Sequence, residues 1–196
     1  MNLRPNILDL GCGNNKVNGS TGMDVAKLDS VDIVHDLLSF PYPIEDESYD
    51  LIYLRHTIEH FTIENIGLIL NECHRILKKN GEIQINVPHV FSIAAYTDLT
   101  HKSYFTFNSG KFWDRNNAKS YYNDISAIWN LKKTECSLNW FDWKGRLMSY
   151  INLKLSKVME YRIKMALNNR TKPSLADRIV KKYSFQMVEI RWILQK

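Results

Sequence analysis

The residues best suited to chemistry lie in one short segment, LRHTIEH (54–60). It places His56, Glu59 and His60 in a His-x-x-Glu-His pattern, in which two histidines on one helical face hold zinc and the glutamate acts as a base. These residues directly follow an apolar strand pattern, however, and the helical period begins only later in the chain. A third ligand, for which Glu135 is a candidate, would also be needed. A zinc metallohydrolase is therefore an alternative rather than the leading interpretation.

Two glycines one residue apart mark a second group. The run ILDLGCG is a buried-strand pattern that ends in a tight turn at Gly11 and Gly13, where backbone N–H groups and the Asp9 carboxylate can face a ligand. Asp24 and Asp36 end the next two apolar segments, and a carboxylate at the end of a second strand suits ribose hydroxyls. The residue three places after Gly13 is lysine, so the glycine pattern of NAD-binding proteins is incomplete. The group predicts a cofactor that contains a nucleoside.

Strands and one strong helix must position these residues. Residues 62–81 carry apolar side chains at three- and four-residue spacing, followed by two lysines, an asparagine and a glycine, which predicts an amphipathic helix and its end. Short apolar segments predict seven strands, within residues 7–10, 21–26, 30–37, 48–56, 81–89, 130–141 and 185–194. The alternation favours parallel strands with helical crossovers, and ligands on such sheets bind at the carboxyl ends of the strands.

The length and composition indicate one globular domain over residues 1–196. Hydrophobic residues make up 44% of the chain and charged residues 24%, which is typical of a protein that folds on its own. The three cysteines form no Cys-x-x-Cys pair, which favours a reducing compartment. The first residues lack the apolar stretch of a signal peptide, and no apolar run is long enough to span a membrane. We expect a cytoplasmic protein.

The net charge of +5 is concentrated in one segment, residues 144–182, which holds 11 lysines and arginines against 2 acidic residues. Its apolar residues follow helical spacing, so we expect a basic helical insertion before the last strand. Such a segment can be a solvated helix face, attract a phosphate-bearing small substrate, or contact an anionic membrane surface. It carries no nucleic-acid-binding motif and no aromatic platform, so nucleic acid is not favoured. The sequence does not indicate an oligomeric state.

The order of the segments is similar to that of a known enzyme family. ILDLGCGNN, GMDVA, VHDL, YDLIYLRHTIEH and HRILKKNGEIQINVPH, in this order, closely resemble small bacterial class I S-adenosylmethionine-dependent methyltransferases over residues 5–108. The resemblance implies a Rossmann-like, doubly wound, mostly parallel α/β sheet of seven strands, and S-adenosylmethionine as cofactor. It also implies a set of cofactor-binding residues: Asp9, Gly11, Cys12, Gly13, Asp24, Val25, Asp36, Leu37, Leu54, Arg55 and His56.

Each part of this set would contact a different part of the cofactor. The resemblance implies that Asp9 and the glycine turn hold the methionine end, Asp24 the ribose and Asp36 the adenine, while His56 lies beside the transferable methyl group. Only ten residues separate Gly13 from Asp24. The helix that usually follows the first strand must therefore be reduced to about one turn.

Four histidines are candidates for a catalytic base or for aligning the acceptor: His56, His60, His89 and His101. Methyl transfer from a sulfonium is a one-step displacement that needs alignment, plus a base where the acceptor is a hydroxyl. Histidine suits that role near neutral pH. Some relatives with a similar Glu-His pair bind a divalent metal, but their first acidic residue is His56 here, so we expect no obligatory metal.

The leading hypothesis is a methyltransferase that uses S-adenosylmethionine to O-methylate a small polar acceptor. By analogy with small bacterial enzymes of this kind, we expect a sugar or nucleotide-linked sugar used in surface polysaccharide biosynthesis. The alternatives are the zinc metallohydrolase and a catalytically idle partner protein that keeps the cofactor-binding fold.

Overall fold

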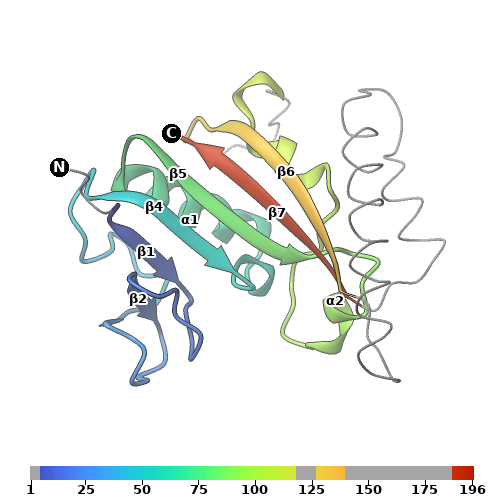
Figure 1. The fold of residues 1–196 in the computed structure, drawn as a ribbon, viewed down its shortest axis with the longest axis horizontal. Helices are drawn as coiled ribbons and strands as arrows, with labels where there is room; N and C mark the ends of the chain where they lie inside the picture. The colour runs from blue at the N-terminus through green and yellow to red at the C-terminus, as the bar shows by residue number, and fades with distance from the viewer. Residues whose placement is uncertain (1–4, 118–126, 140–186) are drawn as a thin grey trace.

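The computed structural model describes residues 5–117, 127–139 and 187–196, which form a seven-stranded sheet (Figure 1). The strands are β1 (Ile7–Leu10), β2 (Thr21–Asp24), β3 (Ile33–Val34), β4 (Tyr49–Arg55), β5 (Leu77–Pro88), β6 (Asn130–Asn139) and β7 (Met187–Gln195). Their order across the sheet is β3-β2-β1-β4-β5-β7-β6. Neighbouring strands from β3 to β5 pair in parallel, whereas β7 is antiparallel to both β5 and β6. The predicted Rossmann-like α/β fold is confirmed.

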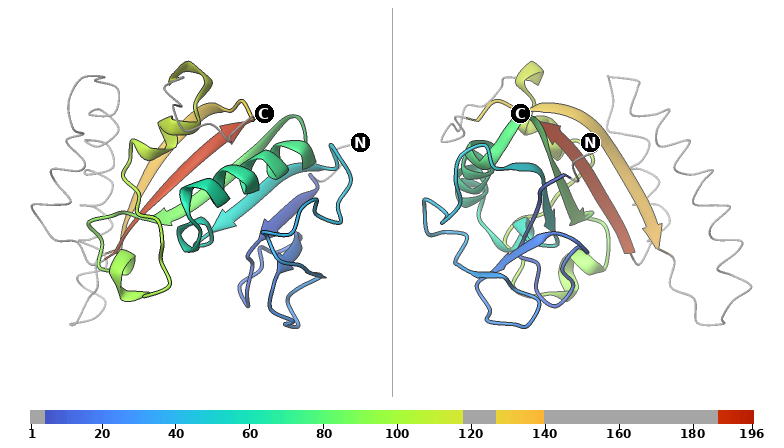
Figure 2. Two further views of the ribbon diagram at one scale, coloured as in Figure 1. Left: turned by 180° about the vertical axis from the view of Figure 1, so that it is seen from behind. Right: turned by 60° about the vertical axis from the view of Figure 1, so that its left-hand side comes forward.

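One long amphipathic helix, α1 (Ile63–Ile76), lies against one face of the sheet beside β4 and β5 (Figure 2). The Thr62 side chain accepts a hydrogen bond from the Asn65 N–H at its start, as an N-cap residue does. The buried face of the helix carries apolar side chains at the predicted spacing: Ile66, Ile69, Leu70, Cys73 and Ile76. Burial of this face fixes the position of the preceding segment, which leads from β4 into the helix.

The end of this helix differs from the prediction. The helix stops at Ile76, and the lysines expected in its last turn belong to β5 instead. Leu77 is already extended and pairs with Tyr49, and the register then shifts before Leu51. Lys78 forms an ion pair with Asp50 of β4, at 2.9 Å. Cross-strand pairing and this ion pair therefore replace the expected helical stop.

The connection from β1 to β2 contains only turns over residues 11–20. This agrees with the expectation that the first helix is reduced to about one turn. Because β1 and β2 are parallel, the end of β1 lies beside the end of β2, and the Gly11 N–H donates to the Met23 carbonyl at 2.8 Å. The glycine turn is therefore fastened to the neighbouring strand.

The hydrophobic core lies between the sheet and α1. Alternate residues of the central strands are fully buried there, including Ile52 in β4, Ile83 in β5 and Trp192 in β7. Because side chains alternate along a strand, residues such as Gln84 and Arg191 lie on the opposite face of the sheet. Trp192 packs edge-on against aromatic rings from the segment after β5, which also contains α2 (Ala94–Thr97), η2 (Ser109–Trp113) and η3 (Arg115–Asn117).

The basic helical insertion predicted over residues 144–182 lies outside the described residues. The prediction of a single domain over residues 1–196 likewise stays a prediction. Among the residues that the structure describes, none of the helices has the length and apolar character needed to cross a membrane.

Candidate cofactor and acceptor site

The strand order creates a crevice at one edge of the sheet. From β1 the chain continues to β2 and β3 on one side, whereas β4 and β5 lie on the other side. Ligands of open α/β sheets bind where the order reverses in this way, at the carboxyl ends of the strands. The loops after β1 and β4 meet at this point, which is where the predicted cofactor residues lie.

Gly11 and Gly13 shape the turn after β1 for different reasons. Gly11 has φ of +66° and a Cβ there would lie 2.5 Å from Thr57 Cγ2, so the close approach of the loop after β4 requires glycine. Gly13 has φ of +49°, but nothing lies within 4 Å of the position of its Cβ. The space beside Gly13 therefore allows a ligand to approach the backbone.

Asp24, at the end of β2, holds the glycine turn in place. Its Oδ2 accepts the Gly13 N–H at 2.9 Å, and its Oδ1 accepts the Ala26 N–H at 2.9 Å. Each carboxylate oxygen can accept a further hydrogen bond, and the side chain is half-buried. Ribose hydroxyls can therefore donate to Asp24 while it keeps the turn ordered.

Asp9 and Arg55 form an ion pair across the ends of β1 and β4. Asp9 is fully buried, and its Oδ2 accepts from Arg55 Nη2 at 2.7 Å and from the Val17 N–H at 2.8 Å. Arg55 also donates to the Asn15 carbonyl, while Asp9 Oδ1 has no hydrogen-bond partner in the described part of the chain. The unpaired carboxylate oxygen can accept a hydrogen bond from an ammonium group, and the partly exposed guanidinium can donate to a carboxylate. These are the two charged groups of an amino acid, so the pair fits the methionine end of the cofactor.

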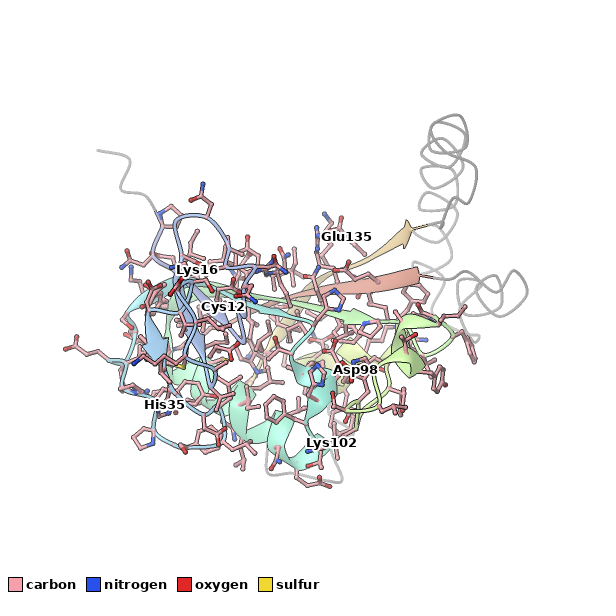
Figure 3. All side chains as sticks on the ribbon, turned by 90° about the horizontal axis from the view of Figure 1, so that it is seen from below. Cys12, Lys16, His35, Asp98, Lys102 and Glu135 are labelled. Carbon is pink, nitrogen blue, oxygen red and sulfur yellow. The ribbon has the colours of Figure 1, made fainter. Side chains whose placement is uncertain are left out.

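The remaining predicted cofactor residues differ in exposure. Asp36 and Val25 are exposed at the ends of β3 and β2, and Cys12 lies nearly buried in the glycine turn. Leu54 and Leu37 belong to the hydrophobic core, with 0% and 5% of their surface exposed. Only their backbone can face a ligand, and the predicted contacts of these two residues with the cofactor stay predictions. Figure 3 labels Cys12 on the loop after β1.

His56 connects the cofactor edge to a neighbouring cavity. Its φ is +52°, a left-handed conformation that is rare outside glycine and asparagine, and its N–H donates to the Asn86 carbonyl at 2.9 Å. The Glu59 carboxylate lies 3.4 Å from His56 Nδ1, and this interaction raises the pKa of the imidazole although burial opposes the rise. Backbone strain of this kind is concentrated at functional sites.

The cavity has a volume of about 1090 Å³. Three of the four predicted catalytic histidines line it together, although they come from different segments: His56, His60 and His101. Glu59 of the turn after β4 also lines the cavity, and further lining residues come from the end of β5 and from the segment that contains α2, including Pro88, Ile93, Thr97, Asp98 and Thr100. The structure thus brings together residues that the sequence could only name as separate candidates.

For two of these histidines, the hydrogen bonds show which ring nitrogen carries the hydrogen in the neutral form. His101 Nδ1 lies 2.9 Å from the Ala95 carbonyl, which can only accept, so Nδ1 carries the hydrogen. His60 Nδ1 lies 2.8 Å from Thr100 Oγ1, whose own hydrogen is donated to Asp98. His60 therefore also donates through Nδ1. In the neutral form, each imidazole has the lone pair on Nε2.

His60 and His101 lie side by side with Glu59. Their ring centroids are 4.9 Å apart, and one donor atom from each of the three residues lies within 4.8 Å of the other two. Glu59 is fully buried. These three residues are the group that can hold a metal ion among the described residues.

The single-helix zinc arrangement of the alternative hypothesis is not present. Only Ile58–His60 form a helical turn, η1, and His56 lies before it with a left-handed backbone. His56 and His60 therefore do not project from one helical face as the metallohydrolase pattern requires.

His89 lies apart from the other three histidines. It is fully buried, its ring packs 4.7 Å from that of Phe107, and its Nδ1 accepts the Phe91 N–H at 3.1 Å. It is not among the residues that line the cavity. We therefore leave it out of the proposed mechanism.

Sequence reasoning missed three residues that organise the site. Thr57 packs against Gly11, and Thr100 and Asp98 orient His60. Figure 3 labels Asp98 on the segment after α2. A weak signal was present, because aspartate two residues before threonine is typical of a turn in which the carboxylate accepts a backbone N–H. That signal predicts the turn but not its contact with His60.

Known structures define the class of protein to which this fold corresponds. A methyltransferase from Bacillus halodurans is 14% identical and superposes with a TM-score of 0.59, over 100% of this chain and 94% of the other. A SAM-dependent methyltransferase from Archaeoglobus fulgidus is 17% identical, with a TM-score of 0.57 over 98% and 86% of the two chains. The fold is thus that of class I S-adenosylmethionine-dependent methyltransferases.

A family model matches a part of the chain that contributes to the crevice. Residues 23–85 match the model described as a methyltransferase domain, whereas curated proteins give no significant match. The matched residues run from β2 through β4 and α1 into β5, and so include the ends of β2 and β4 at the crevice. This part of the chain thus resembles a methyltransferase domain, and its fold is shared with structures that include a SAM-dependent methyltransferase.

Proposed function

We propose that the protein transfers the methyl group of S-adenosylmethionine to a hydroxyl oxygen of a small polar acceptor in the histidine cavity. The observation that carries the proposal is the adjacency of the two sites. His56 ends the cofactor edge at β4 and also lines the cavity with His60 and His101. A methyl group beside His56 would therefore face this space.

The residues at the crevice fit the cofactor. The open space beside Gly13, the unpaired oxygen of Asp9 and the guanidinium of Arg55 suit the methionine end. Asp24 suits the ribose, and the exposed Asp36 suits the adenine, with the backbone of Leu37 beside it. When bound, S-adenosylmethionine supplies an electrophilic methyl group on a sulfonium.

The protein aligns the acceptor and takes up its proton. In the transfer, the acceptor oxygen would bond to the methyl carbon and the bond from that carbon to sulfur would break, so the acceptor hydroxyl must also lose its proton. The hydroxyl proton passes to a basic nitrogen, and Nε2 of His60 or His101 is suited to accept it because Nδ1 of both rings already donates a hydrogen bond. His56 then helps to position the acceptor beside the methyl group.

The cavity favours a small acceptor over a macromolecule. Its volume of about 1090 Å³ is close to the upper end of the usual range for small-molecule sites. Its lining mixes apolar side chains with the hydroxyls of Thr97 and Thr100 and the carboxylate of Asp98, a combination that suits a polyhydroxylated molecule. A sugar or nucleotide-linked sugar, methylated in the cytoplasm during surface polysaccharide biosynthesis, is the acceptor that we propose.

The basic segment at residues 144–182 is the candidate contact for a phosphate of this acceptor. Its charge would attract a nucleotide-linked sugar more strongly than a neutral sugar. Contact of the same segment with an anionic membrane surface remains a prediction.

The test is methyl transfer from radiolabelled S-adenosylmethionine to a panel of free and nucleotide-linked sugars. We expect His101→Ala to lower kcat by about 100-fold or more while S-adenosylhomocysteine binds with unchanged affinity. His74→Gln is the control, because His74 lies in the last turn of α1, about 16 Å along the helix from its first residue, Ile63, and does not line the cavity. Unchanged turnover in both His60→Ala and His101→Ala would contradict the mechanism, whereas cofactor binding without transfer to any acceptor would favour the idle partner.

A further inference from the structure

Two imidazole rings and a buried carboxylate meet in the cavity wall, with one ligand atom of each within 4.8 Å of the other two, and His56 Nδ1 approaches the carboxylate only to 3.4 Å. The lone pairs of His60 and His101 are on Nε2, because each Nδ1 already donates, to Thr100 and to the Ala95 carbonyl. Both carboxylate oxygens of Glu59 are buried and have no hydrogen-bond partner in the described part of the chain. Such a group attracts a cation, since acceptors alone cannot satisfy one another.

The burial of Glu59 makes an uncompensated site costly. Glu59 has no exposed surface, and a buried carboxylate that is neither paired nor hydrogen-bonded is strongly disfavoured. His56 Nδ1 approaches Oε1 only to 3.4 Å, and the His56 side chain is 56% exposed. A contact at that distance on an exposed ring offers weak compensation.

We propose that Glu59, His60 and His101 bind a divalent first-row transition metal such as zinc. Two imidazoles and one carboxylate form a ligand set that suits zinc and iron, whereas magnesium prefers oxygen ligands throughout. The expectation from the sequence was that no metal is required, and the His-x-x-Glu-His pattern suggested His56 rather than His101 as a ligand. The folded chain assembles a different triad.

The contacts around the triad are those of ligand-orienting groups. A metal-bound histidine usually donates its second ring nitrogen to a carbonyl, carboxylate or hydroxyl, which fixes the ring and its tautomer. His101 does so with the Ala95 carbonyl, and His60 does so with Thr100, which itself donates to Asp98 at 2.6 Å. The binding nitrogens are therefore oriented before a metal arrives.

The distances require only a small closure. Zinc bonds of about 2.1 Å at tetrahedral angles separate the ligand atoms by about 3.4 Å, and the three donor atoms lie within 4.8 Å of one another. Side-chain movements that shorten the longest of these distances by about 1.4 Å close this gap. His60 and His101 come from different segments, the turn after β4 and the loop after α2, so the metal would also join these segments.

The position of the triad suggests what the metal does. Three protein ligands leave at least one coordination position for water or a substrate atom, and all three residues line the cavity. A hydroxyl bound there would lose its proton more easily, and this proton would pass to water in the cavity, because the metal would then occupy the ring nitrogens of His60 and His101 that otherwise act as the base. This role depends on the proposed O-methylation, whereas metal binding itself does not.

Titration of the purified protein with cobalt, followed by displacement with zinc, tests the site. We expect one cobalt ion per chain with visible absorption bands, and zinc should raise the midpoint of thermal unfolding by about 5 °C or more at saturation. Glu59→Gln keeps the shape of the side chain and should weaken cobalt binding at least about tenfold, as should His101→Ala. The His74→Gln control removes a histidine outside the cavity and should bind cobalt like the wild type.

The results separate this proposal from the proposed function. Absent cobalt binding, or equal affinity in wild type, Glu59→Gln and His101→Ala, would overturn the metal site. Stabilisation of Glu59→Gln by zinc as large as that of the wild type would overturn it as well, and this readout also reports whether the variant is folded. Binding of S-adenosylhomocysteine in the same samples tests the cofactor site, so a protein that binds cobalt but not the cofactor would retain the metal site alone.

Discussion

Gly11→Ala should lower the free energy of unfolding by about 2–5 kcal/mol. A side chain at φ of +66° costs about 1–2 kcal/mol. The added Cβ would also lie 2.5 Å from Thr57 Cγ2 and 2.7 Å from Thr57 Oγ1, and overpacking of this kind costs about 1–3 kcal/mol more. Thr57 is buried between the loops after β1 and β4, so it cannot move into solvent without breaking its bond to the Leu10 carbonyl.

Gly13→Ala is the matched control for this prediction. Gly13 has a similar φ of +49°, but no atom lies within 4 Å of the added Cβ, so only the backbone cost of about 1–2 kcal/mol applies. Because the new methyl group enters the space in which the cofactor should lie, this variant should instead lose affinity for S-adenosylhomocysteine. Gly11→Ala should thus mainly lower the free energy of unfolding, whereas Gly13→Ala should mainly lower the affinity for S-adenosylhomocysteine.

Urea denaturation with and without a second substitution gives the decisive comparison. Thr57→Ala removes the two atoms that clash, so the double variant Gly11→Ala/Thr57→Ala should be more stable than the sum of the single effects predicts, by about 1–3 kcal/mol. Equal destabilisation by Gly11→Ala and Gly13→Ala, or strict additivity in the double variant, would refute the contact between the two loops.

Three further predictions concern single residues. Asp24→Ala should weaken binding of S-adenosylhomocysteine about 10- to 100-fold in calorimetry, because a hydrogen bond to a charged group contributes about 1.5–3 kcal/mol; unchanged affinity would exclude ribose binding by Asp24. Burial, together with the neighbouring carboxylates, raises the pKa of the Cys12 thiol. Alkylation of Cys12, measured by mass spectrometry, should therefore be slower than that of a model thiol, and slower still when S-adenosylhomocysteine is bound. An equal rate with and without this ligand would place the cofactor elsewhere. Hydrogen bonds from the Lys78 ammonium and a backbone N–H lower the pKa of Asp50, so this stabilisation is present above about pH 4 and is lost as the pH falls below it. At pH 7, Asp50→Asn should cost less than about 1 kcal/mol, since the pair is partly exposed, and a cost that persists at pH 2 would contradict the ion pair.

Local patterns were sufficient to predict the strands of the sheet and the glycine turn at its edge. The strands that end before Gly11 and at Asp24 are short apolar runs. A glycine, which allows a tight turn, follows the first and a charged residue ends the second, so the local sequence indicates both the strand and its end. The ten residues from Gly13 to Asp24 also indicated a reduced first helix. The carboxyl ends of parallel strands lie on one edge of the sheet, so the residues after β1 and those at the end of β2 lie close together once the fold is known.

The residues that the sequence could not place depend on contacts between distant segments. His89 and His101 look equivalent in the sequence, but the first packs against Phe107 and the second reaches the cavity. The end of α1 was predicted too late, because pairing of Leu77 with Tyr49 in the neighbouring strand overrides the local helical pattern. Long-range pairing of this kind leaves no local signature.

The sequence likewise did not indicate that Glu59, His60 and His101, the proposed metal-binding triad, lie together. The spacing of His56 and His60 suggested a single helix, and the left-handed backbone at His56 prevents it. The third member comes from a loop about 40 residues later in the chain, whose position is set by its own turn. Sequence spacing describes a ligand set only where all its members lie on one element.

A crystal structure of the protein with S-adenosylhomocysteine tests the account most directly. We predict that the ribose hydroxyls contact Asp24, that the methionine end lies beside Asp9 and Arg55, and that the sulfur lies next to His56 and points into the cavity lined by His60 and His101. A cofactor bound at another edge of the sheet, or a sulfur that points away from this cavity, would contradict both the assignment of the acceptor site and the proposed mechanism.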